Sequence, residues 1–290
     1  MLNNIAVLLT CFNRKNKTLE CLNHLNLASE PFSKSLKIDV YLTDDSSSDG
    51  TYDAVKKEYP DVTLLKGNGS LFWANGMINS WQAALKKDYD GYLLLNDDTY
   101  VFDNLFHQII EAHEYCLEKY KRGGVYVGST YDKDTNKHTY GGSIFKNWFW
   151  YRVQQLIPNG EYQECHLGNA NILFASKEAV DTVGILSNGY LHGVADYDYT
   201  LKCVKKKVPV LVLPEYAGFC KFDHKSLYYD FEKKSLRERI SYLYSPLGID
   251  FKSRLMYMKK FFPYRYPFFF IVGWFKVFFP SSYKFILKRK

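Results

Sequence analysis

The chain has 290 residues, of which 47% are hydrophobic and 24% are charged, and its formal net charge is +7. This composition excludes a disordered protein, and the length suits one large α/β domain or one domain with an appended element. The six cysteines are scattered, without a CxxC pair or a metal-finger spacing, which argues against a disulfide framework and indicates a reducing compartment.

The first hundred residues begin an alternation of predicted strands and helices. Residues 5–10 are a short apolar run that is typical of a strand buried on both faces. The run has neither a basic flank nor a small-residue cleavage site, so we expect a strand here and not a signal peptide. Residues 15–27 place Leu19, Leu22 and Leu25 at helical spacing, which predicts a helix.

The same alternation continues along the chain. Three further strands are predicted, at KIDVYLTDD, VTLLK and DGYLLLNDD. The helices between them are predicted at SSDGTYDAVKKEY and NGMINSWQAALKK. Strand, helix and strand in this order predict an α/β fold with a mostly parallel sheet and right-handed crossovers.

The second half of the chain is less regular. Apolar runs predict strands at VYVGST, GNANILFAS and VPVLVLP. Between them, KEAVDTVG predicts a short helix, and HGVADYDYTLKCVKKK predicts a loop that continues into a helix. From about Phe231 the pattern becomes helical and basic, so we expect a catalytic domain over residues 1–230 and a helical extension over residues 231–290.

Polar side chains follow the predicted strands at the points where the strands end. In open α/β sheets the ligand-binding crevice lies at the carboxyl ends of the strands. This rule brings together six side chains from four segments: Thr10, Asp44, Asp45, Asn68, Asp97 and Asp98.

Two of these segments carry paired carboxylates. Residues 43–51, TDDSSSDGT, could hydrogen-bond a base and a ribose, although Ser and Asp also serve as ordinary helix N-caps. Residues 95–99, LNDDT, offer hard oxygen ligands to a metal ion on a diphosphate. Adjacent carboxylates are costly to hold together unless a cation or solvent neutralises them, and a solvated turn is the alternative interpretation.

Two later segments carry further ionisable groups. In HGVADYDYTLK, Asp196 and Asp198 precede a helix that bears Lys202, so one Asp could deprotonate an acceptor hydroxyl while the other holds the loop. A capped helix explains the same residues. In FDHKSLYY, His224 between Asp223 and Lys225 could complete a metal or diphosphate site, although a lone His is more often a satisfied polar residue.

Six segments in this order resemble the family-2 glycosyltransferases with the GT-A fold, and in particular their rhamnosyltransferase-like members. The resemblance covers about residues 5–230 and rests on LLTCFNR, TDDSSSDGT, GNGSLFWANGM, LLNDDT, GNANILFAS and HGVADYDYTLK. It implies a central, mostly parallel sheet flanked by helices. It also implies the transfer of a sugar from a nucleotide-sugar donor.

The resemblance implies a role for each polar residue near the strand ends. The donor's nucleoside would be bound by Thr10, Phe12, Arg14, Asp44 and Asp45. The donor's ribose or diphosphate would lie near Asn68, Asn75 and Gly76.

The remaining roles concern the metal and the base. LNDDT is similar to the family's DxD motif, so Asn96 and Asp97 would face the donor and Asp98 would bind Mg²⁺ or Mn²⁺. His224 would be a further metal ligand. Asp196 would be the catalytic base, supported by the residues Asp198 and Lys202.

The chain departs from the family pattern at two positions. Asn96 replaces the first acid of the DxD motif, and Ala195 stands where a Glu usually precedes the base. A non-catalytic glycan-binding or scaffold protein with the GT-A fold is therefore the alternative function. The QxxRW motif of processive synthases is absent, so we expect the transfer of one sugar, by a single displacement with inversion.

The last thirty residues are aromatic and basic. Their apolar stretch of about a dozen residues is interrupted by Lys276 and is too short to span a bilayer. Aromatic, Lys and Arg side chains suit a segment in the headgroup region, so we expect a cytoplasmic enzyme that lies on the inner face of the cell membrane. A helix packed on the catalytic domain or on a partner subunit is the alternative.

Other classes fit the sequence less well. A nucleotide-dependent oxidoreductase needs a glycine fingerprint after the first strand, and TCFNRKNKT contains no glycine. A nucleic-acid partner is excluded because the strand-end acids would repel phosphates without a metal. The NDD variant and the FWANGM loop favour a dTDP-deoxysugar donor such as dTDP-rhamnose, with UDP-sugars open.

Family habit suggests a glycan or lipid-linked oligosaccharide acceptor in bacterial capsule, O-antigen or similar surface polysaccharide synthesis. The sequence leaves open whether the chain forms a homo-oligomer.

Overall fold

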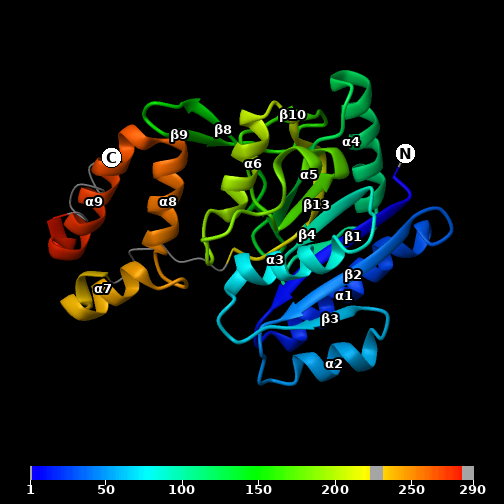
Figure 1. Ribbon diagram of the computed structural model, residues 1–290, viewed down its shortest axis with the longest axis horizontal. Coiled ribbons are helices and arrows are strands. Elements are labelled where there is room, and N and C mark those ends of the chain that lie inside the picture. Colours follow the sequence, from blue (N-terminus) through cyan, green and yellow to red (C-terminus); the bar gives the residue numbers. More distant parts are fainter. Residues whose placement is uncertain (1, 223–230, 283–290) are drawn as a thin grey trace. The chain divides into compact units, whose positions relative to one another are not determined.

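The computed structural model describes residues 2–222 and 231–282, and its residue contacts divide the chain into two units (Figure 1). The first unit contains residues 1–186 and 196–222, and the second contains residues 187–195 and 223–290.

The first unit is built on a mixed sheet whose strands lie in the spatial order β10, β13, β6, β12, β4, β1, β2, β3. In chain order, the strands on this path are β1 (Asn4–Cys11), β2 (Lys37–Asp44), β3 (Thr63–Lys66), β4 (Gly91–Leu95), β6 (Val125–Asp132), β10 (Gln163–Glu164), β12 (Ile172–Ser176) and β13 (Val210–Phe219). Two short strands pair at its margins, β5 (Tyr100–Val101) with β13 and β7 (Lys137–His138) with β6.

The strands that carry the predicted site run parallel to one another. Strand β1 pairs in parallel with β2 and with β4, and β2 pairs in parallel with β3. Strand β12 is antiparallel to its neighbours β4 and β6, whereas β13 is parallel to β6. The prediction of a mostly parallel central sheet flanked by helices is therefore confirmed.

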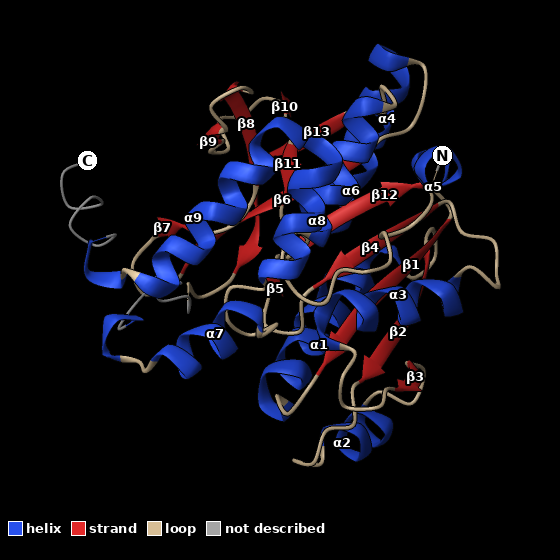
Figure 2. Cartoon of the chain, turned by 60° about the vertical axis from the view of Figure 1, so that its left-hand side comes forward, coloured by secondary structure: helices blue, strands red, loops and turns tan. Residues whose placement is uncertain are grey.

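Helices cover both faces of this sheet (Figure 2). They are α1 (Lys15–Ser29), α2 (Thr51–Glu58), α3 (Phe72–Ala84), α4 (Leu105–Tyr120), α5 (Lys177–Val183) and α6 (Ala195–Lys205), and a 3-10 turn, η1 (Glu30–Phe32), follows α1.

Strand β1 shows why the apolar run at the N-terminus is uninterrupted. Ile5, Val7 and Leu9 belong to the buried cluster that includes side chains of α1 and α4. Ala6 and Leu8 belong to the cluster that includes side chains of α3 and α6. Alternate side chains of a strand point to opposite faces of the sheet, so a strand covered on both faces has apolar residues at successive positions.

A smaller antiparallel sheet accompanies the main one in the first unit. It contains β11 (Leu167–Gly168), β8 (Gly142–Asn147) and β9 (Arg152–Gln155), with β8 in the centre. Strands β8 and β9 form a hairpin, and its turn contains residues 148–151.

The second unit is helical in its described part. It contains α7 (Leu236–Tyr244), α8 (Phe251–Phe261) and α9 (Tyr266–Phe278), with the 3-10 turns η2 (Phe231–Lys233) and η3 (Pro263–Arg265). Its helices share a small apolar core that includes Leu243, Phe251 and Val277. No helix within the described residues has the length and apolar character needed to cross a bilayer.

Residues 187–195 group with the second unit, although the sequence places them inside the predicted catalytic domain. The reason is hydrogen bonding to the beginning of α8. The backbone N–H groups of His192 and Gly193 donate to Asp250 Oδ2 at 3.2 and 3.0 Å, and Leu191 N–H donates to Ser253 Oγ at 3.4 Å. These contacts tie the segment to α8.

Candidate active site

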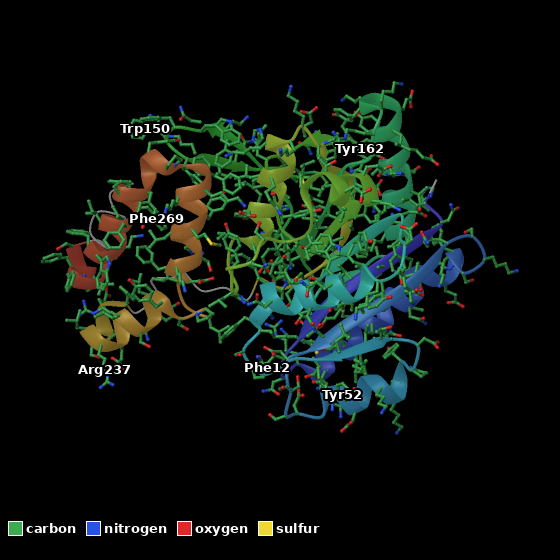
Figure 3. All side chains as sticks on the ribbon, in the orientation of Figure 1. Phe12, Tyr52, Trp150, Tyr162, Arg237 and Phe269 are labelled. Carbon is green, nitrogen blue, oxygen red and sulfur yellow. The ribbon has the colours of Figure 1, made fainter. Side chains whose placement is uncertain are left out.

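The parallel strands β1, β2 and β4 end at the same edge of the sheet, and their polar residues meet there. Thr10 pairs with Thr43, and Cys11 pairs with Asp44, in the register of β1 and β2. Figure 3 labels two aromatic side chains at this edge, Phe12 after β1 and Tyr52 in α2. Phe12 is half exposed.

Two buried polar atoms at this edge have no hydrogen-bond partner among the described residues. They are Thr10 Oγ1 and Asp44 Oδ2, whereas Asp44 Oδ1 accepts the N–H of Ser47 at 2.6 Å. Buried polar groups in proteins are nearly always paired, because an unpaired one loses its hydration without compensation. These two atoms therefore indicate where a bound polar ligand would complete the hydrogen bonding.

Asp45, next to Asp44, has its carboxylate turned into the protein's own backbone. Its Oδ1 accepts the N–H of Gly69 at 2.8 Å, and its Oδ2 accepts the N–H groups of Leu71 and Phe72 at 2.8 and 3.1 Å. A Cβ atom at Gly67 would lie 2.4 Å from Asp45 Oδ1, so this position requires glycine. The buried carboxylate thus holds the loop that leads into α3.

Three further predicted residues lie in that loop and in α3. Asn68 is exposed, and its Oδ1 accepts the N–H of Ser70 at 3.0 Å, which closes a local turn. Asn75 is partly buried in the first turns of α3. A Cβ atom at Gly76 would lie 2.1 Å from Thr10 Oγ1, so Gly76 permits α3 to approach β1 closely.

The acids that follow β4 are held by cations and hydroxyls from α1 and its N-terminus. Arg14 Nη1 lies 3.1 Å from Asp97 Oδ1 and 2.8 Å from Asp98 Oδ2. Lys17 Nζ lies 3.9 Å from Asp98 Oδ2, and Thr18 Oγ1 donates to Asp97 Oδ2 at 3.2 Å. One guanidinium therefore bridges both carboxylates and neutralises part of their mutual repulsion.

The two acids differ in environment. Asp97 is buried, and burial raises its pKa to about 7, with the charge of Asp98 acting in the same direction and Arg14 opposing both. Asp98 is the more exposed of the two and faces the open edge. Asn96 completes the motif, and its Oδ1 accepts the indole N–H of Trp73 at 2.7 Å. The amide oxygen that replaces the first acid is therefore engaged by α3.

Asp196 lies in the first turn of α6. Its Oδ1 accepts the N–H of Tyr197 at 2.8 Å, and its Oδ2 has longer contacts with Ala170 N and Asn169 Nδ2, at 3.4 and 3.5 Å. Burial raises the pKa of Asp196 to about 6, and the backbone N–H donors oppose that shift. Its carboxylate is thus a stronger base than an exposed one.

The residues predicted to support Asp196 have structural contacts. Asp198 is fully buried. Lys202 Nζ donates to the carbonyl oxygens of Val183 and Ile185, at 3.3 and 2.6 Å, and so ties α6 to the C-terminal end of α5. His224 lies outside the described residues.

The described residues contain no cluster of three or more His, Cys, Asp or Glu side chains arranged to hold a metal ion. Asp97 and Asp98 are a pair of hard oxygen donors. This is the kind of donor set with which proteins bind Mg²⁺ through one or two carboxylates, while substrate phosphates and water complete the coordination.

The family model described as "Glycosyl transferase family 2" matches residues 6–180, which is more than half of the chain. The chain belongs to glycosyl transferase family 2. The matched residues include β1, β2 and β4 with all the acids that follow them, whereas Asp196 lies beyond the match. No curated protein sequence matches the chain.

Solved structures with the GT-A fold resemble this glycosyltransferase over most of its length. The mannosyltransferase PcManGT from Pyrobaculum calidifontis, in complex with GDP-Man and Mn²⁺, superposes with a TM-score of 0.54 at 12% identity, and the match covers 79% of this chain and 60% of that one. S. aureus TarS 1–349 in complex with UDP gives 0.54 at 16% identity, with 86% and 68% covered. The chain thus spans about two thirds or less of these proteins.

Four residues of this glycosyltransferase site have contacts that the sequence did not predict. Asn171 Nδ2 donates to Thr99 Oγ1 at 3.2 Å, and the carbonyl oxygen of Asn171 accepts the N–H of Asn96 at 3.1 Å. Asn169 contacts Asp196, and Trp73 contacts Asn96. The segment GNANILFAS carries both Asn169 and Asn171, so its two amides at a strand start were the available signal.

We expect Asp45→Ala to destabilise the fold by about 2–4 kcal/mol, because three backbone N–H groups lose a charged acceptor. Urea unfolding would measure the loss, and hydrogen exchange should show faster exchange at Gly69, Leu71 and Phe72. The matched control is Asn68→Ala, which removes an exposed local acceptor and should cost about 1 kcal/mol or less. Equal losses in the two variants would contradict the structural role of Asp45.

Proposed function

We propose that this family-2 glycosyltransferase transfers a single sugar from a nucleotide-sugar donor to a glycan or lipid-linked acceptor, with inversion at the anomeric carbon. The observation that carries the proposal is the convergence at one sheet edge of two unpaired buried polar atoms, an acid pair and a weakly acidic carboxyl group. The unpaired polar atoms suit a nucleoside, and the acid pair suits a metal-bound diphosphate. The weakly acidic carboxyl group suits an acceptor hydroxyl.

The unpaired atoms support a nucleoside site between β1 and β2. Asp44 Oδ2 can accept from a base or ribose, and the Thr10 hydroxyl can donate or accept. The related structures hold GDP-Man and UDP, and the sequence favours dTDP- or UDP-linked sugars. We therefore propose a dTDP- or UDP-sugar as the donor, with its base near Asp44.

The acid pair supports a divalent cation, Mg²⁺ or Mn²⁺, on Asp98 with Asp97 beside it. The mannosyltransferase of similar fold contains Mn²⁺. When bound, such a cation would neutralise charge that develops on the departing nucleoside diphosphate. Arg14 now pairs with both acids, so a cation on Asp98 would displace its guanidinium, which could then contact the diphosphate.

Asp196 is the proposed general base. With a pKa raised to about 6 by burial, its carboxylate is ionised at neutral pH and still basic enough to take the proton of an acceptor hydroxyl. Its long contacts with Asn169 and Ala170 leave Oδ2 weakly bonded. The hydroxyl oxygen attacks the anomeric carbon as the bond to the diphosphate breaks, and the proton passes to Asp196.

A non-catalytic glycan-binding protein is the second candidate. Ala195 lacks the acid that usually precedes the base, and the Asn96 amide oxygen is engaged by Trp73. Asn96 and Ala195 each stand in place of an acid, so the reaction site lacks two negative charges that the family pattern would give it. In this reading the protein binds donor or glycan without turnover.

The C-terminal helices support a position on the inner face of the cell membrane. In α9 the side chains of Phe268, Ile271 and Phe278 are exposed at helical spacing, whereas Gly273 and Val277 are buried in the core of the second unit. The helical unit is also rich in basic residues, which include Lys252, Arg254, Lys259, Lys260, Arg265 and Lys276. We propose that α9 lies in the headgroup region and that the acceptor is a lipid-linked intermediate of bacterial surface polysaccharide.

We expect one nucleotide series among UDP-, dTDP- and GDP-sugars to raise the melting temperature of the protein, and to do so more strongly with Mn²⁺. A ligand that binds only the folded state stabilises it by an amount that grows with the ratio of its free concentration to its Kd. Differential scanning fluorimetry would measure the shifts. In Asp98→Asn the Mn²⁺-dependent part should disappear, and the absence of any shift in the native protein would contradict the proposed donor site.

We expect Arg14→Gln to bind Mn²⁺ about tenfold more tightly in the absence of donor, because the guanidinium no longer competes for both carboxylates; that change corresponds to about 1.4 kcal/mol. Electron paramagnetic resonance of free Mn²⁺ would measure the affinity. Lys17→Gln is the control, since Lys17 stands farther from Asp98 and should matter less. Weaker Mn²⁺ binding in Arg14→Gln would argue against the competition.

We expect kcat/KM to fall about tenfold per pH unit below a pKa near 6, because the base must be deprotonated to accept the hydroxyl proton. Protonation of Asp97, whose pKa burial raises to about 7, adds a second loss of rate that begins at higher pH, so the limb assigned to Asp196 is the part that its substitution removes. Asp196→Asn should lower kcat by about 10²–10⁴-fold and abolish this acidic limb. Near-native transfer by Asp196→Asn across the pH range would remove Asp196 from the mechanism.

A further inference from the structure

The turn of the β8–β9 hairpin carries three consecutive large aromatic side chains that are exposed. Trp148, Phe149 and Trp150, here called the aromatic tip, are 42%, 60% and 62% exposed. Trp150 is labelled at the outer end of this hairpin in Figure 3. Large apolar side chains lose the stabilisation of burial when they stay in contact with water, so such a cluster indicates an interaction surface.

The aromatic tip is held in shape by the hairpin itself. Phe145, buried on β8, packs against Trp148 and Tyr151 with ring centroids 4.2 and 5.0 Å away. Asn147 Oδ1 accepts the N–H of Trp150 at 2.8 Å and fixes the turn. The exposed rings are therefore presented by an ordered turn on a buried anchor.

The charge around the aromatic tip is of one sign. Lys146 precedes it, Arg152 follows it, and both are exposed, whereas residues 142–160 contain no Asp or Glu. Trp and Phe side chains flanked by cations favour the boundary between lipid headgroups and acyl chains, where the rings are buried and the cations meet anionic lipids. Each such cation strengthens the attraction to an anionic surface.

We propose that the aromatic tip is a membrane-binding element of the catalytic unit, and that it inserts into the headgroup region of a bilayer containing anionic lipids. The proposal deepens the proposed function, since it rests on a lipid-linked acceptor for its purpose. It concerns a different part of the chain from α9 and stands on its own contacts.

The geometry of the rings favours a bilayer over a glycan. A pyranose ring stacks on a flat aromatic face, but Phe149 and Trp150 meet nearly at right angles, with an interplanar angle of 88° and centroids 5.0 Å apart. One face of Trp148 is occupied by Phe145. Insertion into a bilayer does not require a flat platform, because the transfer of an aromatic ring out of water is favourable in any orientation.

The hairpin also connects the aromatic tip to the proposed base. At the opposite end of β8, Gly142 and Ser143 pair with β11, and Asn169, directly after β11, contacts Asp196. Strand β8 has six residues, which at about 3.3 Å per residue place the tip on the order of 20 Å from this end. A lipid-linked acceptor would therefore extend a few sugar units from the bilayer to reach Asp196.

The test uses the full chain and lipid vesicles without donor or acceptor. Binding is measured by flotation with phosphatidylcholine vesicles, with and without added phosphatidylglycerol. We expect the combined variant Trp148→Ser, Phe149→Ser and Trp150→Ser to bind the anionic vesicles at least about tenfold more weakly. The matched control, Leu27→Ser with Leu85→Ser, removes exposed apolar side chains elsewhere in the same unit and should bind as the native chain does.

A second measurement keeps the test independent of how the triple variant folds. The six native cysteines are buried, so Phe149→Cys offers one accessible thiol for an environment-sensitive fluorophore. We expect its emission to shift to the blue on addition of anionic vesicles. Unchanged emission with vesicles, native-like binding by the triple variant, or a blue shift with soluble oligosaccharides instead of vesicles would each overturn the proposal.

The failure of this proposal is distinguishable from the failure of the proposed function. Vesicle binding is measured without any nucleotide, and donor stabilisation is measured without any lipid. A chain that binds donor but not vesicles through the aromatic tip would retain the proposed reaction and lose the membrane element. A chain that binds vesicles through the aromatic tip but binds no donor would retain the membrane element and lose the proposed reaction.

Discussion

The repulsion between two adjacent carboxylates after β4 is the constraint on which the rest of the site depends. Asp97 is buried, Asp98 borders it, and a cation must compensate for their proximity. In the structure that cation is Arg14, from the loop after β1, with Lys17 farther away. The loops after β1 and β4 are thereby joined electrostatically.

Two neighbouring Asp residues at the end of β2, Asp44 and Asp45, illustrate how the same type of side chain can have different roles. Asp45 gives its carboxylate to the backbone of residues 69–72 and organises the entry to α3. Asp44 keeps one oxygen unpaired in a buried position. The contacts of Asp45 stabilise the protein in the absence of a ligand. The unpaired oxygen of Asp44 costs folding free energy, and a ligand that bonded to it would relieve that cost. A sequence motif of two acids can therefore contain one structural residue and one binding residue.

The family and the architecture were predictable from the sequence because they rest on periodicity and motif order. The apolar run of β1 indicated burial on both faces, and Ile5 and Ala6 indeed lie in different buried clusters. The side-chain contacts were not predictable. Lys202, predicted to support Asp196, donates to carbonyl oxygens of Val183 and Ile185, and Asn96 accepts a hydrogen bond from Trp73. Such contacts depend on distances between elements far apart in the chain, which spacing along a sequence does not encode.

The position of Asp196 at the boundary between the two units has a physical consequence. Residues 187–195 belong to the second unit, and Asp196 is the residue at which the chain re-enters the first. Asp250, at the beginning of α8, accepts from the backbone N–H groups of His192 and Gly193 and so holds the segment that immediately precedes Asp196. The Asp196 carboxylate has contacts of its own, with Ala170 N and Asn169 Nδ2. The side chain and the backbone that precedes it are therefore held by different partners.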